Sequence, residues 1–203
     1  MSSPWRVGLA LALLAAPATA GEMVVFQLDP EHSSVGFVLD ATLHTVDGDL
    51  GPVSGRIAFD PDRHLATGEV VIDLTKAETG IERRDRKMRE QTLETDRYPE
   101  AVYRIHGIDL PDVLRQGRNE IQLHGDLDFH GATHAVAVPA VAVLDGGRVS
   151  ATAWIEIPYV DWGLDDPSFF VLRVGKSVRV EMTIEGRLEG DLATGPAAAP
   201  EPR

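Results

Sequence analysis

Three histidines near one predicted hairpin are the first residues in this chain whose type and spacing could do chemistry: His124, His130 and His134. A metal site needs two or three such ligands that converge, with further hydrogen-bonding partners that orient them. The alternation of residues along this segment places His124 and His130 on a polar face that also carries Asp126 and Asp128. We therefore expect solvated surface histidines and predict no metal site.

A second group of titratable residues falls at positions predicted to face inward. Asp161, Asp165, Arg104 and His106 are the acids and bases that the pattern places there. An enzyme needs an acid or base with a perturbed pKa at its reacting centre. The chain contains no Gly-x-Ser-x-Gly elbow, His-Glu-x-x-His helix, phosphate loop or dinucleotide-binding glycine motif. We therefore predict no catalytic residues and no cofactor, with an enzyme of the cyclase or isomerase type as the alternative.

Length, composition and charge narrow the class of protein. The chain has 203 residues, 43% of them hydrophobic, with a net charge of −13 and no cysteine. These values fit one domain with a full core, and they exclude disulfides and cysteine-ligated metals. So negative a field repels phosphate backbones and anionic leaflets. The charge therefore argues against nucleic acid as a partner and against electrostatic docking to a membrane.

The first twenty residues have the pattern of a cleavable signal peptide. Arg6 is its positive residue, residues 7–16 are apolar, and Ala18-Thr19-Ala20 forms an A-x-A cleavage site. An apolar stretch this short cannot span a bilayer, which takes about 20 residues. We expect an exported periplasmic protein without stable membrane insertion, made of a signal peptide at 1–20, one domain at 21–190 and a disordered Ala- and Pro-rich tail at 191–203.

Alternating apolar and polar residues recur along most of the mature chain, as is typical of β-strands. In the clearest strand, from Val178 to Glu189, one face is apolar and the other charged. Residues 134–144 are apolar on both faces, so we expect both to be covered. Eight or nine antiparallel strands with short turns favour a closed barrel, because closure removes exposed strand edges. The other strands are expected at residues 23–29, 35–43, 57–60, 70–74, 101–110, 121–129 and 149–157.

One helix is predicted between Thr79 and Leu93, with Met88 on its narrow apolar stripe. Because this helix is too polar to fill a core, we expect it to cover an opening of the barrel. Two interpretations of Arg84-Asp85 remain open: the pair anchors the polar end of a ligand, or it is an ion pair that fixes the helix to the barrel. We favour the second.

Small residues interrupt the apolar strand faces: Gly36, Gly125, Gly186, Ala151 and Ala153. An eight-stranded barrel has room inside either for side chains alone or for one small ligand. Any one glycine can instead mark a bend in a strand. Taken together, these positions predict a hollow lumen.

An ordered series of short motifs runs along residues 24–188: Asp29-Pro30-Glu31-His32-Ser33, Phe37, Gly55, Phe59-Asp60, Thr79-Gly80, Arg84-Asp85, Met88, Tyr98-Pro99-Glu100-Ala101, Gly125, Leu127, Phe129, Gly131, Thr133, Pro139, Trp162-Gly163, Pro167-Ser168, Leu172-Arg173-Val174 and Val178. This series resembles the pattern of the YceI-like proteins. The chain departs from the family at Lys87, where histidine is common, at Phe26, where Trp or Tyr is common, and in the loop at 47–51, which carries two aspartates.

The resemblance implies an all-β, lipocalin-like antiparallel eight-stranded β-barrel with one short covering helix. It implies that the barrel holds a long apolar or amphiphilic ligand, such as a polyisoprenoid, quinone or fatty-acid derivative, for transport or storage. A weaker alternative is an adaptor that binds another protein through the loop around Trp162. The sequence leaves the ligand's identity and homodimer formation open. The predicted ligand-binding residues are Phe37, Leu39, Ile57, Phe59, Ile72, Met88, Leu93, Leu123, Leu127, Phe129, Ala151, Ala153, Ile155, Trp162, Phe169 and Phe170.

Overall fold

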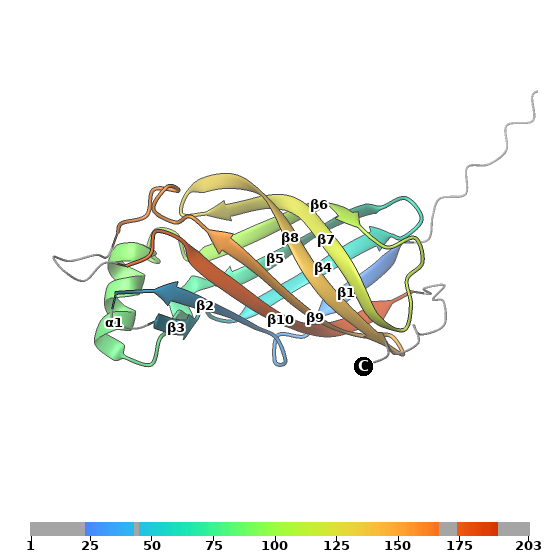
Figure 1. The fold of residues 1–203 in the computed structure, drawn as a ribbon, viewed down its shortest axis with the longest axis horizontal. Helices are drawn as coiled ribbons and strands as arrows, with labels where there is room; N and C mark the ends of the chain where they lie inside the picture. The colour runs from blue at the N-terminus through green and yellow to red at the C-terminus, as the bar shows by residue number, and fades with distance from the viewer. Residues whose placement is uncertain (1–22, 43–44, 167–173, 191–203) are drawn as a thin grey trace, which may run out of the picture.

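The computed structural model describes residues 23–42, 45–166 and 174–190, most of which form antiparallel strands (Figure 1). Eight strands close a barrel in the order β1-β4-β5-β6-β7-β8-β9-β10, and β10 pairs back onto β1. The predicted antiparallel eight-stranded barrel with one short helix is therefore confirmed. The strands are β1 Val24–Leu28, β2 Ser34–Asp40, β3 Thr45–Asp49, β4 Val53–Asp60, β5 Leu65–Asp73, β6 Glu100–Asp109, β7 Gly117–Phe129, β8 Ala132–Asp145, β9 Arg148–Ile157 and β10 Val178–Glu189.

Several segments of the sequence prediction lie outside the described residues: the signal peptide at 1–20, the tail at 191–203, and Phe169 with Phe170. Within the described ranges, no helix has the length and apolar character needed to cross a membrane.

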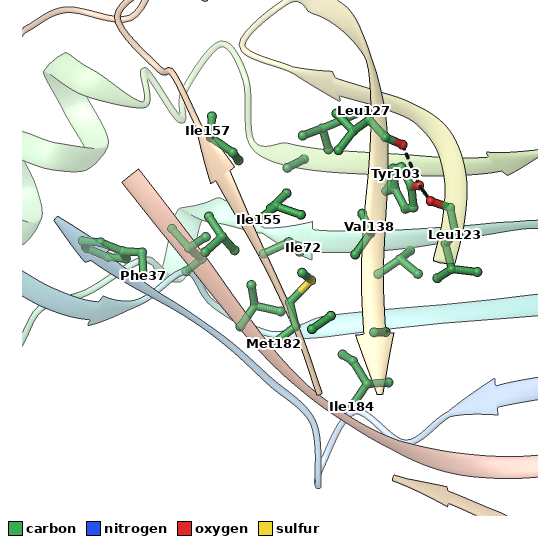
Figure 2. A pocket seen from close by; sticks show the side chains of 18 of the residues that line it. Phe37, Ile72, Tyr103, Leu123, Leu127, Val138, Ile155, Ile157, Met182 and Ile184 are labelled. Carbon is green, nitrogen blue, oxygen red and sulfur yellow. Dashed lines mark hydrogen bonds between the residues drawn. The ribbon is translucent and has the colours of Figure 1, made fainter. Parts of the chain in front are cut away.

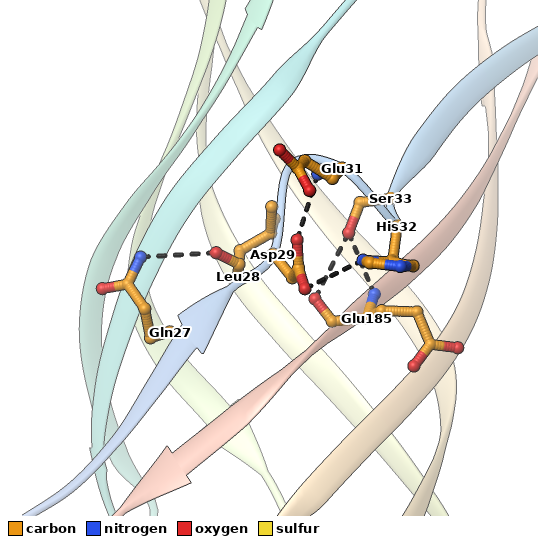
Figure 3. A network of polar contacts seen from close by, with 7 residues as sticks. All are labelled: Gln27, Leu28, Asp29, Glu31, His32, Ser33 and Glu185. Carbon is orange, nitrogen blue, oxygen red and sulfur yellow. Dashed lines mark hydrogen bonds and ion pairs between the residues drawn. The ribbon is translucent and has the colours of Figure 1, made fainter.

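Strands β1 and β2 follow each other along the barrel wall and are separated by a turn that begins at Asp29 (Figure 3). The Asp29 carboxylate accepts a hydrogen bond from the backbone N–H of Glu31 and lies 3.0 Å from Nδ1 of His32. The Asp29 N–H donates to the carbonyl of Glu185 at 2.8 Å, and the Glu185 N–H donates to the Ser33 hydroxyl at 3.0 Å. The turn is thereby bonded to the middle of β10. One edge of β10 consequently pairs with β1 on one side of the turn and with β2 on the other.

The pair β2–β3 continues the wall from β10 at the end where the helix lies (Figure 1). The sequence predicted a loop at residues 47–51, and this is wrong as far as Asp49, because β3 pairs with β2 through Phe37↔Gly48 and its neighbours. Asp49 also bridges to Glu78 in the segment that precedes the helix. The polar composition of β3 fits its exposed position at a sheet edge and hides it from a search for apolar alternation.

The predicted helix is present as α1, Glu82–Lys87, followed by one wider π-type turn over Met88–Thr92. The N–H of Leu93 donates to the carbonyl of Met88 at 2.8 Å and closes this turn. In Figure 1 the helix lies across one end of the barrel, beside β2 and β3. It therefore covers an opening, as its polar composition predicts.

Strand β8 does not have two covered faces, contrary to the prediction for residues 134–144. Its burial alternates, with Val138, Ala140 and Ala142 buried toward the interior and Ala137 and Pro139 exposed on the outside. The outer face is apolar but small, since alanine and proline dominate it. Trp154 of β9 is also on the outside and 58% exposed.

Gly125 and Gly186, two of the small residues from which a lumen was predicted, do not leave empty space, so they do not account for the cavity. A Cβ atom built on Gly125 would lie 2.7 Å from the ring of Tyr103, and one on Gly186 would lie 2.5 Å from the ring of Phe26. The ring of Phe37 covers Gly48 in the same way. Each of these glycines lets an aromatic side chain lie flat against the barrel wall.

Replacing Gly125 with alanine is expected to destabilise the fold by about 1–3 kcal/mol, because the new methyl group would overlap Tyr103 and the Arg104 carbonyl. The matched control is Gly107→Ala in β6, where the nearest atom to the new Cβ would be His124 Cβ at 3.6 Å. That control should be neutral or stabilising by up to about 1 kcal/mol. Urea unfolding of both variants measures the difference, and equal stabilities would show that Tyr103 does not press on Gly125.

Candidate functional site

An apolar cavity of about 410 Å³ occupies the interior of the barrel (Figure 2). Its walls come from strands on all sides, with Ile72 of β5, Ile155 of β9 and Met182 of β10 among them. Pockets for small molecules have volumes of roughly 300–1,000 Å³. The interior is therefore a cavity of ligand size rather than a packed core.

Most of the residues predicted to bind ligand line this cavity. Trp162 does not line it, and Phe169 and Phe170 lie outside the described residues. Whether the lining residues bind a ligand stays a prediction. Those that line it are Phe37, Leu39, Ile57, Phe59, Ile72, Met88, Leu93, Leu123, Leu127, Phe129, Ala151, Ala153 and Ile155.

Alanine side chains on two adjacent strands leave much of the space inside. Ala140 of β8 pairs with Ala153 of β9, and Ala142 pairs with Ala151 two residues further on. All four side chains face the cavity. Because a methyl group fills little of the volume that a leucine would fill, this side of the wall stays recessed.

Sequence reasoning missed the contribution of β8, where Val136, Val138 and Leu144 also line the cavity. Both faces of this strand are apolar, so composition could not show which one points inward. The register does show it: Leu127 of β7, whose strand has a clear polar face, pairs with His134, and Leu123 pairs with Val138.

Tyr103 of β6, also missed, places a hydroxyl group in the cavity wall. The hydroxyl oxygen lies 3.1 Å from the carbonyl oxygen of Leu123 and 3.0 Å from that of Val136, so its hydrogen can be donated to either (Figure 2). Burial, helped by the negative charge of Asp126, raises the pKa of Tyr103. The hydroxyl therefore stays neutral and is bonded to the protein itself.

Two further polar side chains in the lining, Asn119 and Tyr159, are also satisfied internally. The Asn119 amide donates to the Arg115 carbonyl at 2.8 Å and accepts from the Arg115 N–H at 3.0 Å. The Tyr159 hydroxyl donates to the Gly175 carbonyl at 2.7 Å, and burial together with the charge of Asp166 raises the pKa of Tyr159 to about 12. These groups hold the wall together and leave its surface apolar toward a ligand.

The helix end of the cavity has a different character. Arg84 and Lys87 of α1 are the charged side chains in the described part of the lining, and Thr79 and Thr92 lie with them. Met88, between the two cations and Thr92 in sequence, also lines the cavity. The cavity surface is almost wholly apolar even here, so these two side chains meet it mainly through their carbon atoms, at the end that α1 covers.

Arg84 and Asp85 are not bonded to each other, which corrects the predicted ion pair; both are bonded to Thr79. Asp85 is buried and accepts from the Thr79 N–H at 2.7 Å and from the Thr79 hydroxyl, while Arg84 Nε donates to that hydroxyl oxygen at 2.6 Å. Burial alone would raise the pKa of Asp85, but the bonds from Thr79 and the charges of Arg89 and Arg84 outweigh it and lower the pKa. Asp85 thus fixes α1 to the chain before it.

Trp162 lies at the seam between β8 and β9. Pairing of these strands ends at Ala140↔Ala153, next to Pro139, which has no N–H to donate. Beyond that point the Trp162 ring stacks on His134 of β8, with centroids 3.7 Å apart and planes at 6°. Its edge faces Phe129, which lines the cavity. Trp162 therefore packs against β7 and β8 at the edge of the core, and these contacts do not favour an adaptor role through its ring.

The titratable residues that the sequence placed inside are outside. Arg104 is 53% exposed and forms ion pairs with Glu69 and Asp128 on the outer surface. His106, Asp161 and Asp165 are exposed as well. The irregularity in the pairing of β6 with β7 between Ile105 and Gly107 changes the alternation near His106, and a loop has no period from which the orientation of the two aspartates could be read.

The three histidines do not converge on one point. His124 is on the outer surface, as predicted, with Nε2 2.8 Å from the Asp109 carboxylate. The expectation of a solvated His130 is wrong, because only 12% of its side chain is exposed and Nε2 lies 2.9 Å from the Glu94 carboxylate. His134 is covered by Trp162. Among the described residues, no group of three or more His, Asp or Glu side chains is arranged to hold a metal ion.

Comparison with known proteins assigns the barrel to a family. The model of the YceI-like domain matches residues 26–186. The chain belongs to the YceI-like family. A UPF0312 protein of Vibrio cholerae is 21% identical to this YceI-like protein over 189 residues, which are 89% of this chain and 95% of the relative. A UPF0312 protein of Vibrio campbellii is 26% identical over 143 residues, covering 68% and 72%.

Solved structures have the same fold as this YceI-like barrel. BcnA of Burkholderia cenocepacia superposes with a TM-score of 0.66 at 17% identity, covering 78% of this chain and 98% of BcnA. A polyisoprenoid binding domain from Saccharophagus degradans, implicated in plant cell wall breakdown, superposes with a TM-score of 0.64 at 20% identity, covering 80% and 97%. At such identities the likeness shows a shared fold.

Replacing Asp85 with Asn tests whether the Asp85 carboxylate fixes α1 to the preceding segment of this YceI-like protein. Because the folded-state pKa of Asp85 is lowered, its carboxylate contributes stability above the unfolded-state pKa of about 4, and this contribution is lost as the pH falls through the folded-state pKa. Near pH 7 the variant should be less stable by about 1–3 kcal/mol. Urea unfolding from pH 7 downward should show this difference shrinking in acid. Asp96→Asn, at an exposed position, is the control and should change little; a difference independent of pH for Asp85→Asn would contradict the assignment.

Proposed function

We propose that this YceI-like protein is an exported carrier or store that holds a long apolar or amphiphilic chain, of the polyisoprenoid or a related class, inside its barrel. The single observation that carries the proposal is the apolar cavity of about 410 Å³, whose polar groups away from α1 are bonded to the protein itself. The polyisoprenoid binding domain of Saccharophagus degradans, with the same fold, supports the ligand class.

The energetics of such a cavity favour a chain of many carbons. Burial of each methylene contributes about 0.8 kcal/mol, so a dozen carbons bind tightly with no specific polar contact along the chain. The lining side chains are otherwise without contacts on the side that faces the cavity. A chain in the lumen would supply those contacts.

A binding role is favoured over an enzyme by the titratable groups in the lining. Within the described lining these are Arg84, Lys87, Tyr103 and Tyr159, and neither a carboxylate nor an imidazole is among them. Both tyrosine pKa values are raised, so neither hydroxyl is a base near neutral pH. The two tyrosines therefore offer no general base for chemistry on a bound chain, and a carrier needs none.

The cellular location is also part of the proposal. The signal-peptide pattern of residues 1–20 supports export to the periplasm. An apolar chain crossing an aqueous compartment has to be shielded from water, and a closed barrel with an apolar lumen provides such shielding.

Mass spectrometry of an organic extract of the purified protein is the direct test. We expect an apolar or amphiphilic molecule, recovered chemically unchanged after long incubation with the protein. An extract without any such molecule, from protein that also fails to take up added long-chain probes, would refute the carrier proposal. Conversion of the bound molecule during incubation would favour the enzyme alternative.

Replacing Ala153 with Phe should block the lumen, because the new ring would enter the cavity next to Ala140. Displacing two or more methylenes of the chain costs at least about 1.6 kcal/mol, which is roughly tenfold in affinity. The matched control is Ala137→Phe on the exposed face of β8. Both variants should keep the circular dichroism spectrum of the parent, and only Ala153→Phe should lose ligand. Equal uptake by both would place the ligand outside the lumen.

A further inference from the structure

We infer that the mouth beside α1 selects ligands whose chain ends in an anionic head group, a carboxylate or a phosphate, and that Arg84 and Lys87 contact this head. The inference rests on the proposed function, since it assigns the polar end of the same ligand.

The first observation is the sign of the charges that meet the cavity. Within the described lining, Arg84 and Lys87 carry positive charge and no aspartate or glutamate is present. This is notable against a chain with a net charge of −13, in which carboxylates outnumber cations by 32 to 19. An apolar cavity that ends at two cations matches an amphiphile that ends in an anion.

The second observation is that these cations retain unused hydrogen-bond donors. Arg84 Nε and Nη2 are bonded to Thr79 at 2.6 and 3.2 Å, whereas Nη1 has no hydrogen bond to the described residues. Lys87 forms neither a hydrogen bond nor an ion pair with them, and Thr92 adds a hydroxyl group to the same lining. Bonding to Thr79 fixes the plane of the guanidinium, so its free edge is held in place for an acceptor.

The third observation is the local charge balance. Asp85 is the buried carboxylate nearest to these cations, and its charge is already shared with Arg89, whose Nη1 donates to the Ala77 carbonyl at 2.7 Å. The charge of Asp85 is therefore shared between Arg89 and Arg84. The excess positive charge at the mouth is not compensated from within the lining.

The other polar groups in the lining cannot hold the head group. The hydroxyls of Tyr103 and Tyr159 donate to backbone carbonyls, and the Asn119 amide is bonded to Arg115. A head group deep in the lumen would lose its hydration without gaining a partner. A head group at α1 would keep contact with water and gain the two cations.

The test compares three probes with the same chain: dodecanol, dodecanoate and dodecyl phosphate. Each displaces a fluorescent apolar reporter from the delipidated full-length mature protein. Both anions should bind at least about tenfold more tightly than the alcohol, and Lys87→Met should reduce anion affinity about five- to tenfold while dodecanol changes less than about twofold. Arg84→Met should act in the same direction, with circular dichroism confirming that α1 persists.

Arg86→Met is the matched control, because Arg86 carries the same charge on the same helix but is exposed and does not line the cavity. It should leave the affinity for all three probes within about twofold of the parent. A loss of anion affinity equal to that of Lys87→Met would mean that the positive charge acts only through long-range attraction, and would contradict a specific head-group site.

Equal affinities for alcohol and anions in the parent would also contradict this site. Displacement of the reporter by inorganic phosphate alone would show an anion site that needs no chain. Binding of dodecanol without preference for the anions refutes this inference and leaves the carrier proposal standing, whereas failure of all three probes refutes both.

Discussion

Closure of the hydrogen-bonded wall is the constraint on which the rest of this structure depends. Because β10 pairs back onto β1, the barrel completes its ladder without help from a packed centre. The backbone polar groups that would otherwise need burial against other elements are bonded within the wall. The interior can therefore remain hollow, and the side chains that face it are free to serve a ligand.

The long strand β10 closes the barrel by pairing with β1, but only part of its length takes part in this pairing. Its one edge serves both β1 and β2, and the turn at Asp29 absorbs the change of direction through its bonds to Glu185. On the other edge of the sheet, pairing of β8 with β9 stops at Ala140, next to Pro139, and the ring of Trp162 stacks on His134 in the part of β8 beyond. The carboxylate of Asp29 and the imidazole of His32 thus belong to a turn of the wall.

The sequence predicted the barrel and most of its lining because alternation is unambiguous where the outer face is charged. In β10, Val180 and Met182 face inward because Arg179, Glu181 and Thr183 cannot. The same reasoning fails for β8, whose two faces are both apolar. It fails differently for Gly125, because a period of two residues does not reveal that Tyr103 of a neighbouring strand covers that glycine. The sequence singled out the Arg84-Asp85 motif. Only the fold shows that the arginine lines the cavity and that the aspartate does not.

The paired alanines of β8 and β9 have a consequence for how such a protein changes over evolution. Residues on one face of a strand repeat every second position, about 6.6–6.8 Å apart. Ala151 and Ala153 are therefore spaced at this interval along the lumen. A single-codon change from alanine to valine at one of them would shorten the chain that fits, while the distant end at α1 keeps its charges. Under the proposed function, the length and the terminal group of the ligand are thus selected by separate parts of one wall, and either can change in evolution without the other.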